Sequence, residues 1–130
     1  MLRAFVTAFA AGLAALSSCS AAVAQQPIKQ GDMLTGKLRL VATSHPNGTR
    51  IEAYQIVSEP RIMPANDDFC DYDKGATMFH LFTMTDAARK QLKPLLGKVV
   101  TVKATALFCS ETAWHVGDVA VPEWTVVGKP

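Results

Sequence analysis

Hydrophobic and polar residues alternate along most of the chain from residue 33 onward, with the two-residue period of a β-strand that buries one face. In the first such stretch the residues expected on the buried face are Leu34, Gly36, Leu38 and Leu40. In the clearest stretch they are Val100, Val102, Ala104, Ala106 and Phe108. Five strands are predicted, the first running from residue 33 to a turn at His45 and the others covering residues 49–58, 77–84, 98–109 and 115–127.

Turn-forming and strand-breaking residues mark the ends and irregularities of these strands. The run from His45 to Gly48 contains Asn-Gly, which tolerates positive φ at both positions and predicts a tight hairpin between the first two strands. The alternation of the second strand slips near Ala53–Tyr54, as a β-bulge would produce. Pro122 divides the last strand, which suits an edge strand or a bend.

A short helix is predicted between the third and fourth strands. Thr85 can accept hydrogen bonds from the amides of the first turn, Asp86 complements the helix dipole, and Pro94 and Gly97 end the segment. The order strand, strand, strand, helix, strand, strand is that of the OB-fold, a five-stranded Greek-key barrel. We therefore expect a mainly β protein, a small OB-like barrel with one short helix between strands three and four. A five-stranded antiparallel sheet with a helix on one face has the same element order.

The first 24 residues have the features of a signal peptide. Arg3 precedes an uncharged apolar run over residues 4–16, and Ala22-Val23-Ala24 forms an A-x-A cleavage site before Gln25. A second route is open, because Leu16-Ser17-Ser18-Cys19 is similar to a bacterial lipobox, in which Cys19 would carry the lipid. Either route exports the protein, to the periplasm or to a lipid anchor. Residues 25–32 are then a short polar lead-in and residues 33–128 a single domain.

The composition excludes two classes of protein. The chain has 130 residues, of which 49% are hydrophobic and 18% charged, with 13 basic and 11 acidic residues. Since Arg3 is the only charged residue of the leader, the mature chain keeps 12 basic and 11 acidic residues, a net charge of +1. An acidic disordered tail and a polybasic nucleic-acid-binding arm are both excluded by this balance. The mature chain also has no further apolar run long enough for a transmembrane segment.

Two cysteines remain after the leader, Cys70 and Cys109. In an oxidising compartment a disulfide between them is the default expectation. Closing a loop of about 40 residues contributes about 4 kcal/mol by chain-entropy reasoning. The sequence lacks the C-x-x-C spacing of a redox pair and a histidine cluster that would make a metal site with the cysteines.

The side chains that could carry chemistry are scattered. His45 is expected to be solvated in its turn, and His80, inside an apolar strand, to be a hydrogen-bonded structural residue. The acidic stretch around Asp71 and Asp73 does not fit the register of an EF-hand loop, which leaves a solvated loop or weak calcium binding. Nucleophile motifs and a recognisable carboxylate pair are lacking, so no catalytic, metal-binding or cofactor-binding residue is predicted.

Two loops hold the candidate contact residues. OB-folds commonly bind ligands with the loop between their last two strands and with the face of strands two and three. Trp114 and His115 lie in or next to that loop, whereas Asp71, Tyr72 and Asp73 belong to the acidic loop. The alternative for Trp114 is that it packs over the end of the barrel.

Two short runs and several spaced residues, most of them in predicted strands, form a recognisable pattern: Leu34-Thr35-Gly36-Lys37-Leu38, Pro94-Leu95-Leu96-Gly97-Lys98, Val100, Val102, Leu107-Phe108, Thr112, His115 and Val119. This pattern resembles the core of an exported bacterial family catalogued only as a domain of unknown function (family 4431). The resemblance implies an OB-like fold and no particular activity, because its motifs are mostly strand packing. The family often has a histidine-rich run between the last two strands, which implies a metal. This chain departs from that pattern, because only His115 stands there.

We therefore expect an exported, non-catalytic envelope module that contacts another protein or a cell-wall component, without a cofactor or a nucleic-acid partner. The alternative is an inhibitor or immunity protein that inserts an acidic or aromatic loop into the cleft of a lysozyme-like or other cell-wall hydrolase. A metal-binding envelope protein is a third possibility.

Overall fold

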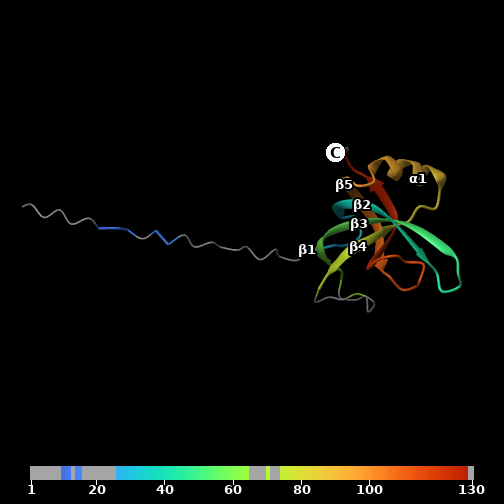
Figure 1. The fold of residues 1–130 in the computed structure, drawn as a ribbon, viewed down its shortest axis with the longest axis horizontal. Coiled ribbons are helices and arrows are strands. Elements are labelled where there is room, and N and C mark those ends of the chain that lie inside the picture. The colour runs from blue at the N-terminus through green and yellow to red at the C-terminus, as the bar shows by residue number, and fades with distance from the viewer. Residues whose placement is uncertain (1–9, 13, 16–25, 65–69, 71–73, 129–130) are drawn as a thin grey trace, which may run out of the picture.

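Strands dominate the part of the chain that the structure describes. The computed structural model describes residues 10–12, 14–15, 26–64, 70 and 74–128 (Figure 1). Its elements are β1 (Gln26–Pro27), β2 (Met33–Ser44), β3 (Arg50–Ile62), β4 (Ala76–Leu81), α1 (Asp86–Leu92), the 3-10 helix η1 (Lys93–Leu95), β5 (Val99–Cys109) and β6 (Val119–Val126).

Five of these strands close into a barrel. The order is β3-β2-β5-β6-β4, and pairing between β4 and β3 closes the ring. All neighbours are antiparallel except β4 and β6, which run parallel. The predicted five-stranded OB-like barrel is confirmed, with α1 between its third and fourth strands. The open antiparallel sheet is wrong, because the β3–β4 pairing leaves no gap in the ring.

The helix begins as predicted and covers one end of the barrel (Figure 1). The Thr85 side chain accepts a hydrogen bond from the Ala88 amide, and Asp86 lies in the first turn. Leu92 is fully buried in the barrel core, together with large side chains from every barrel strand. The largest of these are Leu34, Leu38, Ile56, Phe79, Leu81, Val102, Cys109, Val119 and Val121.

The predicted faces of β2 and β5 need correction. Leu40 was expected on the buried face but is 42% exposed. Beyond residue 37, β2 pairs only with β3, in a hairpin that extends beyond the closed barrel. In β5 the register against β6 shifts between Ala104 and Ala106 and again before Phe108. These irregularities reverse the alternation of buried and exposed residues. Leu107 and Cys109 are buried in place of Ala106 and Phe108, which were expected inside.

The bulge expected near Ala53–Tyr54 is also wrong. Pairing between β2 and β3 is continuous there, and the register shift of β3 lies further on, between Val57 and Arg61, against β4. The alternation slips because both faces of β3 are covered. Tyr54 and Ile56 belong to the barrel core, whereas Ala53 and Gln55 are buried on the outer face.

The last strand is shorter than expected, because residues 115–118 belong to the preceding loop and β6 begins at Val119. It is not an edge strand, since β4 and β5 pair with it on its two sides. Pro122 follows the last residue paired with β4, at the point where the register against β5 shifts. The edge strand is therefore wrong, and the proline coincides with an irregularity of the β5–β6 pairing.

The lead-in before residue 33 contributes to the barrel. Gln26 and Pro27 pair in parallel with the end of β3, and Ile28 is 1% exposed in the core. The guanidinium of Arg61 donates hydrogen bonds to the carbonyls of Gln26, Pro27 and Met33. One side chain thus holds the start of the described barrel in place.

Candidate functional site

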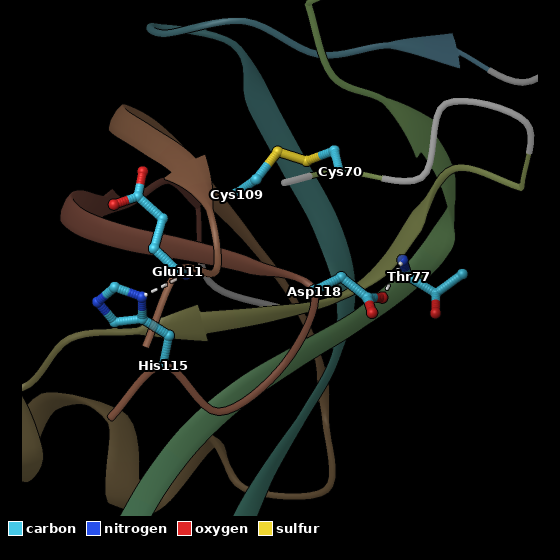
Figure 2. Close-up of a disulfide and its surroundings, with 6 residues drawn as sticks. All are labelled: Cys70, Thr77, Cys109, Glu111, His115 and Asp118. Carbon is cyan, nitrogen blue, oxygen red and sulfur yellow. Dashed lines mark hydrogen bonds between the residues drawn. A yellow bond between two sulfur atoms is a disulfide. The ribbon is translucent and has the colours of Figure 1, made fainter. Parts of the chain in front are cut away.

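The loop between β5 and β6, residues 110–118, is folded around one histidine side chain. Nδ1 of His115 accepts a hydrogen bond from the Glu111 amide, at 3.0 Å (Figure 2). It also accepts one from the Thr112 amide, at 3.4 Å. The His115 amide in turn donates to the Thr112 carbonyl, and the Trp114 amide to the Thr112 hydroxyl. His115 therefore acts as a clamp within the loop, and the loop has a defined shape.

This loop meets the β2–β3 turn through two stacked rings. The imidazole of His45 and the indole of Trp114 lie 3.9 Å apart between centroids, with an angle of 20° between their planes. Trp114 is nevertheless 45% exposed. Its ring contact is with the turn, and the alternative that Trp114 packs over the barrel end stays a prediction. We call this pair the His45–Trp114 platform.

The turn that carries His45 is itself held by local hydrogen bonds. Nδ1 of His45 accepts from the Asn47 amide, and Oδ1 of Asn47 accepts from the Thr49 amide. Gly48 has a positive φ of 90° and Asn47 does not, so the turn uses the positive φ that Asn-Gly tolerates at one of its two positions. The expectation that His45 is solvated is also wrong, because stacking leaves it half-buried.

An aromatic cluster packs against the His115 ring. The imidazole of His115 packs against Phe108 of β5, at 5.1 Å between centroids, and against Phe82, at 5.7 Å. Phe82 also contacts the ring of His80, at 4.8 Å. The loop is thus packed on the barrel wall.

Polar contacts fix the other half of the loop to the outer face of β3 and β4. Val116 is bound at both of its backbone groups, since its carbonyl accepts from the Gln55 amide side chain and its amide donates to Nδ1 of His80 at 3.0 Å. The Asp118 carboxylate accepts from the Thr77 amide at 3.0 Å (Figure 2) and from the Met78 amide, also at 3.0 Å. His80 is therefore the hydrogen-bonded structural histidine that its strand position predicts.

His80 is 8% exposed, and its charge state is affected by this burial. Burial, and to a smaller extent the positive charge of His115, lowers the pKa of His80 from 6.5 to about 4. At neutral pH His80 is therefore uncharged, which its role as a hydrogen-bond acceptor at Nδ1 requires.

The predicted disulfide is present at the start of the same loop. Cys70 and Cys109 are joined, with their Cα atoms 5.4 Å apart, within the usual range for a disulfide (Figure 2). Ser110 follows directly, and its hydroxyl oxygen is buried without a hydrogen-bond partner among the described residues. The bridge thus joins the segment before β4 to the end of β5.

The other candidate residues lie outside the described residues. Asp71, Tyr72 and Asp73 follow Cys70 directly in the sequence, and Cys19 belongs to the leader. Their expected roles as contact residues and as a lipidation site stay predictions. Among the residues with described positions, no three His, Cys, Asp or Glu side chains are grouped closely enough to hold a metal ion.

Two residues that hold the loop, Gln55 and Asp118, were not identified from the sequence. Gln55 is an amide in the middle of a run of β-forming residues, and Asp118 precedes the apolar start of the last strand. Each is a polar residue beside apolar ones, but the partners that they bind are far away in the sequence and are brought to them only by the fold.

The fold and the site define a small OB-like barrel with a loop-borne aromatic platform. No protein-family model matches the chain, and it has no match among curated proteins or solved structures. The resemblance to family 4431 therefore stays a prediction. Within the described part of the chain, no helix has the length and apolar character that crossing a bilayer requires.

Proposed function

We propose that this chain is an exported, non-catalytic module of the bacterial cell envelope that binds another protein through the His45–Trp114 platform. The observation that carries the proposal is an indole ring that is both exposed and fixed in orientation. Trp114 is 45% exposed while its ring stacks on His45 and its backbone is bound to Thr112.

Such a residue is suited to protein recognition for two physical reasons. Tryptophan offers a large apolar area together with an N–H donor, and it is enriched among the residues that dominate binding energy. A ring already held in place loses little conformational freedom on binding, so more of the contact energy appears as affinity. Both reasons favour a binding role for the platform.

The first prediction is that Trp114 is a residue on which binding strongly depends. A photocrosslinking phenylalanine derivative at position 114, in cells that export the protein, is expected to capture one envelope protein. Trp114→Ala is then expected to weaken binding to that purified partner by about 2 kcal/mol, or about 30-fold in Kd, as for a central tryptophan of an interface. Isothermal titration calorimetry with wild type and variant measures this change.

Val99→Ala is the matched control, because Val99 is another large apolar side chain exposed on the surface, at 60%. Its binding is expected to equal that of wild type. No protein captured from position 114, or equal weakening by both variants, would refute the platform as the binding surface. A captured cell-wall hydrolase whose activity falls on binding would identify the chain as an inhibitor of that enzyme.

A second prediction concerns export. The protein recovered from the envelope fraction of intact cells is expected to begin at Gln25, with Cys70 and Cys109 oxidised, as measured by intact-mass and peptide mass spectrometry. A diacylglyceryl group on Cys19 would show the lipoprotein route instead. An uncleaved chain with free thiols that stays inside the cell would contradict the proposed export.

A further inference from the structure

The 110–118 loop lies on the part of the barrel that OB-folds commonly use for ligands. That part is the outer face of strands two and three, with the loops between strands one and two and strands four and five. Here the corresponding elements are β3, β4, the turn at residues 45–49 and the 110–118 loop. The loop covers the outer face of β3 and β4, since Val116 is bound to Gln55 of β3 and to His80 of β4.

Two histidines hold the loop through the same atom. Nδ1 of His80 accepts from the Val116 amide, and Nδ1 of His115 accepts from the amides of Glu111 and Thr112. An imidazole accepts at Nδ1 only while that nitrogen carries no proton. Protonation of His80 would turn its Nδ1 into a donor that faces the Val116 amide N–H, and this hydrogen bond would be lost.

The charged groups near the loop would not stabilise a positive charge on His80. Arg39 of β2 bonds to Gln55 and to the sulfur of Met78, on the same outer face, and is itself a cation. The Asp118 carboxylate already accepts from two amides of β4, and Figure 2 shows the Glu111 carboxylate directed away from the His115 ring. His80 pairs with Gln55 of β3 and with Ala120 of β6, and the His115 ring contacts Phe108 of β5; all three of these residues are uncharged.

We propose that the 110–118 loop is a strap that protonation of His80 releases from the outer face of β3 and β4. Release separates Trp114 from His45, because the stacked indole moves with the loop. It also uncovers Gln55 and His80, which are 2% and 8% exposed with the strap in place. This inference does not rest on the proposed partner, since it concerns the chain alone.

The sign of the pH dependence follows from His80. Its pKa is about 4 with the strap closed and returns towards 6.5 when release exposes the ring, so the released state binds protons more tightly. Above pH 6.5 the closed strap is fully stabilised. Each unit of pH below 6.5 is expected to favour release by about tenfold, until the pH reaches about 4.

Amide hydrogen exchange measured by NMR tests this inference on the oxidised mature protein without a partner. The protection factor of the Val116 amide, corrected for the intrinsic pH dependence of exchange, is expected to fall about tenfold per unit between pH 6.5 and 4.5. The amides of Leu38 and Val102 in the barrel strands are expected to keep their protection, which separates release of the strap from unfolding.

His80→Asn is the decisive variant, because the asparagine Oδ1 can occupy the position of Nδ1 and does not titrate. Its Val116 protection is expected to be independent of pH over the same range. Lys90→Ala, at an exposed position of α1, is the control and is expected to keep the wild-type pH dependence.

Constant Val116 protection in the wild type, or an equal loss in the His80→Asn variant, would overturn the inference. Ring nitrogen chemical shifts of the wild type give a test that does not depend on the variant folding. They are expected to show His80 protonated at Nε2 alone at pH 7, and a proton on Nδ1 would also overturn it. Binding by the platform at neutral pH is a separate measurement, so the two proposals can fail independently.

Discussion

Removal of the disulfide is expected to lower the free energy of unfolding by about 4 kcal/mol. The bridge joins residues 39 apart in sequence, and that span contains β4, α1 and the whole of β5. A crosslink across such a span stabilises the folded state by restricting the unfolded chain. Since small domains have total stabilities of only about 5–15 kcal/mol, the loss is a large fraction of the whole.

The position of the bridge adds a reason within the folded state. β4 and β5 are not neighbours in the barrel, because β6 lies between them. The disulfide therefore ties the segment before β4 to the end of β5, beside Val119, where β6 begins and pairs with Cys109. Without the bridge, the start of β6 and the loop before it are held by noncovalent contacts alone.

The measurement is urea unfolding of the oxidised protein, the reduced protein and the Cys70→Ala/Cys109→Ala variant. Reduction keeps both sulfur atoms in place, so it isolates the effect of the crosslink. The variant is expected to lose somewhat more than the reduced protein, because Cys109 is fully buried and truncation leaves a cavity. Equal unfolding midpoints for the oxidised and reduced proteins would contradict the prediction.

The fold could be predicted largely from local signals. Alternation with period two placed the strands, Thr85 marked the helix start, and the count of mature cysteines gave the bridge. The faces of β5 could not be predicted beyond Ala104, because a bulge depends on how the partner strand is paired. Ala53 and Gln55 are buried on the outer face of β3. In the sequence this burial was visible only as an interruption of the hydrophobic–polar alternation.

The candidate site was less accessible to sequence reasoning, because its contacts join distant parts of the chain. The element order alone placed Trp114 and His115 in the binding loop of an OB-fold. Their roles depend on partners that are far away in sequence, such as His45 beneath the indole. The bonds of Val116 to Gln55 and His80, which span 61 and 36 positions, have no local signature at all.

Gly36→Ala is expected to destabilise the barrel by about 3 kcal/mol, although it adds a single methyl group. Gly36 lies where β2 passes from one partner to the other, since residues 37–44 pair with β3 and residues 33–37 with β5. A Cβ at this position would overlap the backbone carbonyl oxygen of Val57 and lie 2.7 Å from Cγ2 of Ile56. The carbonyl belongs to a paired strand and cannot move without disturbing the sheet.

This cost is steric and not conformational, because Gly36 is not among the glycines with positive φ. Alanine lowers the conformational entropy of the unfolded chain, which stabilises the folded protein by less than about 1 kcal/mol. The steric overlap with β3 outweighs this gain, so the net change in stability is a loss. Chemical denaturation of the variant measures the loss. Lys37→Ala, at the next and exposed position of β2, is the control and is expected to stay within about 0.5 kcal/mol of wild type. If Gly36→Ala were equally mild, β3 would have to yield at this crossing, and the close approach of β2 to β3 would not be what requires glycine.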